Sequence, residues 1–96
     1  MEVAVLYFDG CPNWRSADQH VSALADELGI TIIRRKVTTS DEAEASGFRG
    51  SPTILIDGRD PFIRGDEPIG LSCRIYQTPD GPAGAPTIAQ LREVLS

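Results

Sequence analysis

Apolar residues occur along the chain first as an unbroken run and then at helical spacing. Residues 3–8 ("VAVLYF") are continuously apolar, which is typical of a strand buried on both faces. The apolar residues that follow recur every three or four positions: Trp14, Ala17, Val21, Leu24 and Leu28. This spacing predicts an amphipathic helix over residues 12–28. Pro12 suits its first position and Gly29 its end.

The rest of the chain alternates between strand-like and helix-like segments. The pattern predicts a strand at 30–37, a short helix at 40–47, strands at 53–56 and 72–78, and a long loop at 59–71. We expect Ser40 to cap the short helix and Gly47 to close it. Thr87 and Gln90 form a capping box for a last helix. Its core-facing residues should be Ile88, Leu91, Val94 and Leu95.

These elements give the order β-α-β-α-β-β-α and predict one α/β domain spanning residues 1–96 with a mixed four-stranded sheet. The first two strands should be parallel, because a helix connects them through a right-handed crossover. The last two strands fit a hairpin.

Charge and composition narrow the class of partner. The net charge of −5 argues against a nucleic-acid partner, which would need clustered lysine and arginine. The first apolar run is short and preceded by Glu2, unlike a signal peptide or membrane span. We therefore expect a cytoplasmic protein with no membrane partner. In that compartment its two cysteines favour catalysis or metal binding over a structural disulfide.

Cys11 lies between the first strand and the first helix, in the stretch "FDGCPNW". We expect it at the helix N-cap, where unpaired backbone N–H groups and the helix dipole stabilise a thiolate. The thiol pKa should then lie below the ordinary value of about 8.5. Pro12 preorganises the first turn. The alternative is that Cys11 is a small buried core residue.

The element order with a cysteine at this position resembles the thioredoxin and glutaredoxin fold. "GSPT" (residues 50–53) is similar to the family's cis-proline loop, and "SPTILIDGRDPF" and "LSCRIY" extend the likeness. More narrowly, the chain resembles a bacterial group of thioredoxin-like proteins and selenoproteins with a Cys-Pro-Asn-Trp motif, in which selenocysteine can replace Cys11.

This resemblance implies a thiol-disulfide oxidoreductase or thiol peroxidase without a cofactor, with Cys11 as the nucleophile. It implies a cis Pro52 against Cys11 and a Ser51 backbone that hydrogen-bonds an extended substrate. Pro12 and Trp14 complete the candidate substrate-binding residues. The resemblance identifies no substrate; we expect the partner to be a disulfide, a peroxide or a low-molecular-weight thiol such as glutathione.

Trp14 stands where the family has its second cysteine, so the resolving thiol must come from elsewhere. It can be an external thiol or Cys73, or the site does not turn over disulfides. If the last strand is "SCRIYQT", Cys73 lies in the core near the start of that strand. It is then about five residues along the strand from the end of the sheet that carries Cys11, at roughly 3.3 Å each, which is too far for a disulfide. If Asp57-Gly58 is a tight hairpin, or the loop at 59–71 crosses over, Cys73 can approach Cys11.

Two other functions use the same residues. Cys11 and Cys73 could handle soft metals or organomercurials, or the domain could be a non-catalytic binding module, as the exchange of cysteine for Trp14 suggests. His20, the only histidine, is nine positions beyond Cys11, or about 13 Å along a helix, and should not act as its base. Two cysteines and one distant histidine predict no zinc site.

Overall fold

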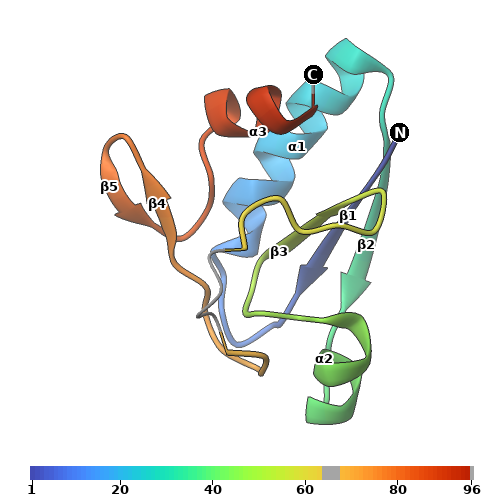
Figure 1. The fold of residues 1–96 in the computed structure, drawn as a ribbon, viewed down its shortest axis with the longest axis vertical. Helices are drawn as coiled ribbons and strands as arrows, with labels where there is room; N and C mark the ends of the chain where they lie inside the picture. Colours follow the sequence, from blue (N-terminus) through green and yellow to red (C-terminus); the bar gives the residue numbers. More distant parts are fainter. Residues whose placement is uncertain (64–67, 96) are drawn as a thin grey trace.

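The computed structural model describes residues 1–63 and 68–95 and shows a mixed α/β fold (Figure 1). Its elements, in order, are β1 (Glu2–Tyr7), α1 (Trp14–Leu28), β2 (Thr31–Lys36), α2 (Ser40–Ser46), β3 (Thr53–Ile56), β4 (Tyr76–Thr78), β5 (Gly81–Ala83) and α3 (Ile88–Leu95).

The main sheet has the strand order β2-β1-β3. β1 pairs in parallel with β2, with Glu2 opposite Thr31, as the helical crossover predicts. β1 pairs antiparallel with β3, with Val3 opposite Ile56, so the sheet is mixed. The predicted fourth strand is not part of this sheet in the described residues.

β4 instead pairs with β5 in a separate two-stranded hairpin, which projects from the side of the molecule in Figure 1. The prediction that the last two strands, at 53–56 and 72–78, pair with each other is therefore wrong. The tight turn at Asp57-Gly58 exists, but it closes only one isolated bridge, between Ile56 and Arg59. Pro61 follows closely and lacks the N–H that a longer ladder would need.

Apolar side chains cover both faces of β1, as its unbroken apolar run predicts. On one face lie α1 and α3, and the fully buried members of this core include Val3, Val5, Val21, Leu24, Ile54 and Leu91. On the other face, Leu6 packs in a smaller cluster with Val37, Ala43 and Phe48. The second cluster joins α2 and the loop after it to the sheet, close to the carboxyl end of β1.

Two predicted helix starts are wrong. α1 begins at Trp14, with Asn13 rather than Cys11 as its N-cap. The N–H of Arg15 donates to the carbonyl of Pro12 at 3.2 Å, so residues 12–15 form a turn before the α-helical bonds begin. α2 is capped by Thr39, whose hydroxyl accepts from the N–H of Glu42.

The last helix, α3, agrees with the prediction from the sequence except at one residue. The hydroxyl of Thr87 accepts from the N–H of Gln90 at 3.1 Å, and the Gln90 side chain accepts from the N–H of Thr87 at 3.0 Å, which confirms the capping box. Leu91 and Leu95 are buried, but Ile88 is 39% exposed. Ile88 begins the helix, before the turn that reaches α1, and the expectation that it faces the core is wrong.

The predicted long loop at 59–71 includes residues 64–67, which lie outside the described residues. Ser72 to Ile75, predicted as strand, are not in a strand; β4 begins only at Tyr76. No helix in the described part of the chain has both the length and the apolar character needed to cross a membrane.

Replacing Leu91 with alanine should lower the free energy of unfolding by about 2–5 kcal/mol, because a fully buried leucine leaves a cavity. Ile88→Ala, on the same helix, is the matched control and should cost less than about 1 kcal/mol. Urea unfolding of the oxidised protein measures both. Equal costs would contradict the placement of these two side chains.

Candidate functional site

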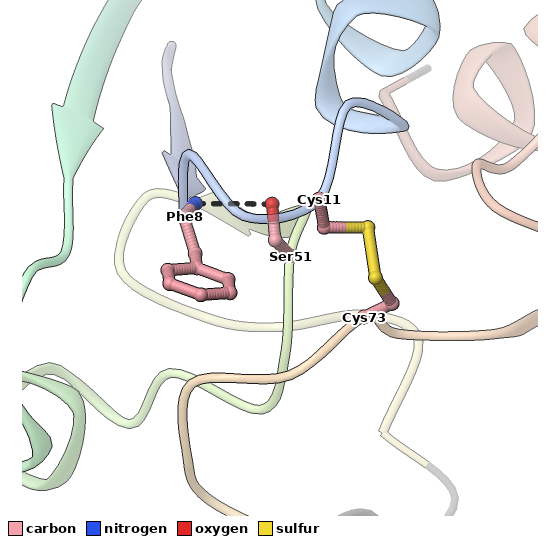
Figure 2. The surroundings of a disulfide bond; sticks show 4 residues. All are labelled: Phe8, Cys11, Ser51 and Cys73. Carbon is pink, nitrogen blue, oxygen red and sulfur yellow. Dashed lines mark hydrogen bonds between the residues drawn. A yellow bond between two sulfur atoms is a disulfide. The ribbon is translucent and has the colours of Figure 1, made fainter.

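Cys11 and Cys73 form a disulfide in the structure (Figure 2). Their Cα atoms are 5.7 Å apart, although 62 positions separate them in the sequence. The register that placed Cys73 in the core, about five residues away, is wrong. Cys73 lies in the irregular segment before β4 and is exposed, and this segment crosses over to the end of the sheet that carries Cys11.

The loop between β1 and α1 fixes the position of Cys11. The N–H of Cys11 donates to the carbonyl of Phe8 at 3.1 Å, which closes a tight turn. The N–H of Phe8 donates to the hydroxyl of Ser51, also at 3.1 Å, and ties this turn to the loop before β3 (Figure 2). Cys11 is fully buried, whereas Pro12 beside it is exposed.

An exposed ion pair between Asp9 and Lys36 joins the same loop to the end of β2. The hydrogen bond from the Lys36 ammonium to Asp9, with the attraction between their charges, raises the pKa of Lys36. Lys36 therefore keeps its positive charge beside the loop throughout the neutral pH range.

The segment 72–74 is held by the backbone of Ser51. The N–H of Ser51 donates to the carbonyl of Ser72 at 2.7 Å, and the N–H of Arg74 donates to the carbonyl of Ser51 at 3.0 Å. These two bonds form a parallel bridge between Ser51 and Cys73. The polar backbone groups of Ser51, which the family resemblance assigns to a substrate, are thus occupied by the protein's own chain.

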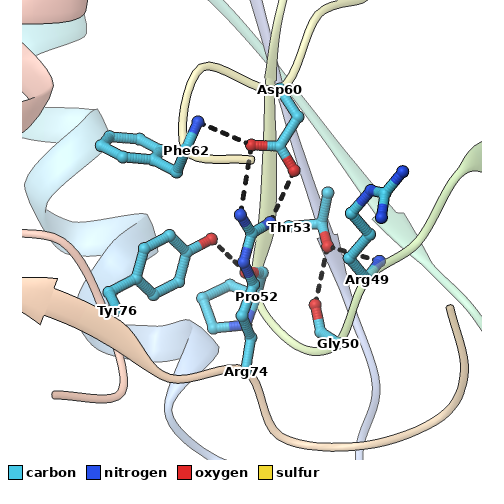
Figure 3. A network of polar contacts seen from close by, with 8 residues as sticks. All are labelled: Arg49, Gly50, Pro52, Thr53, Asp60, Phe62, Arg74 and Tyr76. Atoms are coloured by element: carbon cyan, nitrogen blue, oxygen red, sulfur yellow. Dashed lines mark hydrogen bonds and ion pairs between the residues drawn. The ribbon is translucent and has the colours of Figure 1, made fainter. Parts of the chain in front are cut away.

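Pro52 is covered by the same stretch of chain. The Ser51–Pro52 peptide bond is cis, as the resemblance implied. The hydroxyl of Tyr76 donates to the carbonyl of Pro52 at 2.5 Å (Figure 3), and both Ser51 and Pro52 are fully buried. The two predicted groove residues therefore lie under residues 72–76 in this oxidised state.

A buried ion pair anchors the segment from its other side. The Arg74 guanidinium donates to both carboxylate oxygens of Asp60, at 2.6 and 3.3 Å, and the Arg74 and Asp60 side chains are 2% and 3% exposed (Figure 3). Asp60 also accepts from the N–H of Phe62, and the guanidinium lies over the ring of Tyr76. Because Arg74 follows Cys73 directly, this pair helps to fix the position of the exposed sulfur.

Gly50 makes the close approach of this segment possible. Its φ is +102°, and a Cβ added there would lie 3.0 Å from the Cβ of Arg74 and 3.1 Å from its backbone nitrogen. A side chain at position 50 would thus push against the residue next to Cys73.

Sequence reasoning did not identify Gly50, Asp60 or Arg74 as site residues. The available signal was an arginine next to a cysteine inside an apolar stretch, "SCRIY". That signal does not name Asp60, because the ion pair spans 14 positions across an irregular connection.

The contacts of Trp14 and His20 are with residues other than the two cysteines. The Trp14 ring stacks on Tyr7 at 4.3 Å and is partly buried outside both core clusters, with the Arg15 guanidinium over it. His20 Nδ1 lies 3.0 Å from the carbonyl of Pro86, at the connection that leads into α3.

A shallow groove opens beside Cys73. Its volume is about 310 Å³, and its lining consists of Asn13, Cys73, Arg74, Ile75, Pro82, Ala83 and Gly84. A second groove, of about 360 Å³, lies on the other side of Asn13 and the β5 strand and reaches His20. The described residues contain no group of three side chains suited to hold a metal ion.

No protein-family model matches the chain, and neither the curated proteins nor the solved structures contain a match to it.

Gly50→Ala should weaken the Cys11–Cys73 disulfide, because the new methyl group displaces the Arg74 backbone. We expect the equilibrium constant for the disulfide, measured by titration against glutathione, to fall at least about tenfold, which corresponds to about 1.4 kcal/mol of overpacking. Gly81→Ala is the matched control, because Gly81 has a φ of +103° but no atom within 4 Å of the added methyl group. An equal loss in both variants would show that backbone strain alone is responsible.

Asp60→Asn should destabilise the oxidised protein by about 3–5 kcal/mol, because it leaves the Arg74 charge buried and unpaired. Asp18→Asn breaks a pair of the same 2.6 Å length between exposed Arg34 and Asp18, and should cost only about 0–1 kcal/mol. Urea unfolding gives both values. If the pair also positions Cys73, the glutathione equilibrium constant will fall for Asp60→Asn alone; an unchanged constant would limit the pair to a structural role.

Proposed function

We propose that the protein is a thioredoxin-like thiol redox protein in which Cys11 is the nucleophile and Cys73 the resolving cysteine. The observation that carries the proposal is the Cys11–Cys73 pair, brought to a Cα separation of 5.7 Å by a backbone bridge between distant segments. Cys73, held in this way, supplies the second thiol, which is missing from its usual position because Trp14 stands there.

Cys11 is the better nucleophile of the two on the evidence of its position. It lies two residues before the N-cap of α1, at the positive end of a helix of 15 residues. That end stabilises a thiolate, which is the reactive form of cysteine. Cys73 lies in an irregular segment that leads along the chain into β4 rather than into a helix.

With a peroxide, the Cys11 thiolate attacks one oxygen and breaks the O–O bond, which leaves a sulfenic acid on Cys11 and releases an alcohol or water. The Cys73 thiolate then attacks the Cys11 sulfur, and hydroxide leaves as the disulfide forms. With a disulfide substrate, Cys11 forms a mixed disulfide and releases one thiol, and attack by Cys73 releases the second thiol. Both routes end in the oxidised state of this structure, with two electrons transferred to the substrate.

The fold supports the thioredoxin-like assignment at a coarse level. β1, α1 and β2 form a parallel crossover unit, β3 runs antiparallel to β1, and Cys11 follows β1 directly. In the order of elements along the chain, we propose that β4 corresponds to the last strand of the family's fold. Here β4 pairs with β5.

We expect one equivalent of hydrogen peroxide to convert the reduced protein to the Cys11–Cys73 disulfide, visible as a linked peptide pair after digestion without reduction. Cys73→Ser should stop at a sulfenic acid on Cys11 that dimedone traps, because the resolving thiol is missing. Cys11→Ser should react at least about tenfold more slowly than the native protein, since its remaining thiol has no activating position.

Equal rates for the native protein and Cys11→Ser would overturn the proposal. The soft-metal and binding-module functions require no oxidation of Cys11, and that result would favour them.

A further inference from the structure

The two sulfur-bearing residues of the disulfide differ sharply in accessibility. Cys11, in the loop between β1 and α1, is fully buried. Cys73 is exposed and lines the groove of about 310 Å³ that lies between the start of α1 and the β4–β5 hairpin. Figure 2 shows the bond joining the loop that carries Cys11 to the segment that carries Cys73.

This asymmetry determines which sulfur an incoming thiol can reach. A thiolate attacks a disulfide in line with the S–S bond, from the side opposite the sulfur that leaves, so access to that side controls the rate. The approach to Cys11 passes through the protein interior. Cys73 is exposed and borders an open groove, from which a small thiol can approach.

The identity of the leaving thiolate also favours attack at Cys73. When Cys73 is attacked, the thiolate that leaves is Cys11, which lies just before the N-terminus of α1. A more stable thiolate leaves faster, and a helix N-terminus stabilises it. Attack at Cys11 would instead release Cys73, whose own segment leads into β4 and not into a helix.

We infer that Cys73 is the sulfur through which a small thiol reduces the protein, so that the reductant and a peroxide substrate react at different cysteines. The reductant thiolate attacks Cys73, forms a mixed disulfide with it and releases the Cys11 thiolate. A second reductant thiolate attacks the sulfur of the first reductant, which leaves with it as a disulfide and frees Cys73. Two electrons pass from two thiols to the protein. This inference rests on the proposed redox function and extends it.

The groove beside Cys73 would hold the group attached to the incoming sulfur. Ile75, which is 65% exposed, and Pro82 and Ala83 of β5 give it apolar walls, and Asn13 adds an amide. A low-molecular-weight thiol is small enough to lie in this shallow, mainly apolar space.

The test is to map the first mixed disulfide. The oxidised native protein is mixed with glutathione, quenched at short times with N-ethylmaleimide and digested with trypsin without reduction. Cys11 then lies in the peptide of residues 1–15 and Cys73 in that of residues 65–74. We expect glutathione on Cys73 and maleimide on Cys11, at least about tenfold in excess of the reverse pattern.

The same reaction in urea is the control, because unfolding exposes both cysteines, and the ratio should approach one. Three results would overturn the inference: glutathione mainly on Cys11, a ratio near one in the folded protein, or an equal bias in urea. Failure of the folded protein to form either adduct while the unfolded protein reacts would also overturn it, since Cys73 would then be inaccessible. None of these results bears on whether peroxide oxidises Cys11, so the proposed function is tested separately.

Discussion

Two hydrogen bonds on the backbone of Ser51 connect the parts of the site. They hold Ser72 and Arg74 on either side of Cys73, while the Ser51 hydroxyl accepts from Phe8 in the loop that carries Cys11. One residue thus contacts both cysteine-bearing segments. Because a buried N–H or carbonyl without a partner is costly, the fully buried Ser51 needs this pairing. The site depends on that constraint, since neither segment carrying a cysteine belongs to a helix or strand.

The surrounding residues support the same bridge in different ways. Arg74 is bound to Asp60 on one side and stacked on Tyr76 on the other, which limits how far the chain next to Cys73 can move. Gly50 leaves room for that chain to lie against the loop. The disulfide joins segments that noncovalent contacts already hold together, and the proposed redox function requires this, because the thiols must stay close when the bond is open.

The sequence predicted the elements that depend on local periodicity and failed where distant backbone groups decide. The apolar run at 3–8 and the helical spacing that follows identify β1 and α1, and the Thr87–Gln90 capping box locates α3. The candidate position of Cys11 follows from that order. The course of residues 72–75 does not, because their partner is the main chain of Ser51, and backbone groups are the same in every residue. Apolar alternation in "SCRIYQT" predicted a strand. Its first half is held instead by the buried ion pair of Arg74 with Asp60 and by the backbone bridge between Cys73 and Ser51.

The sequence separation of the cysteines has a thermodynamic consequence for the whole chain. The bond joins residues 62 positions apart and closes a ring that contains α1, β2, α2 and β3, and it leaves β1, the β4–β5 hairpin and α3 outside. In the chain-entropy description, closing such a ring restricts the unfolded ensemble by about 4 kcal/mol. Linkage makes this coupling reciprocal: native structure should favour the closed ring by the same free energy, roughly a thousandfold in its equilibrium constant. The free energy of unfolding and the equilibrium constant of the disulfide are therefore coupled, and a change in either one alters the other.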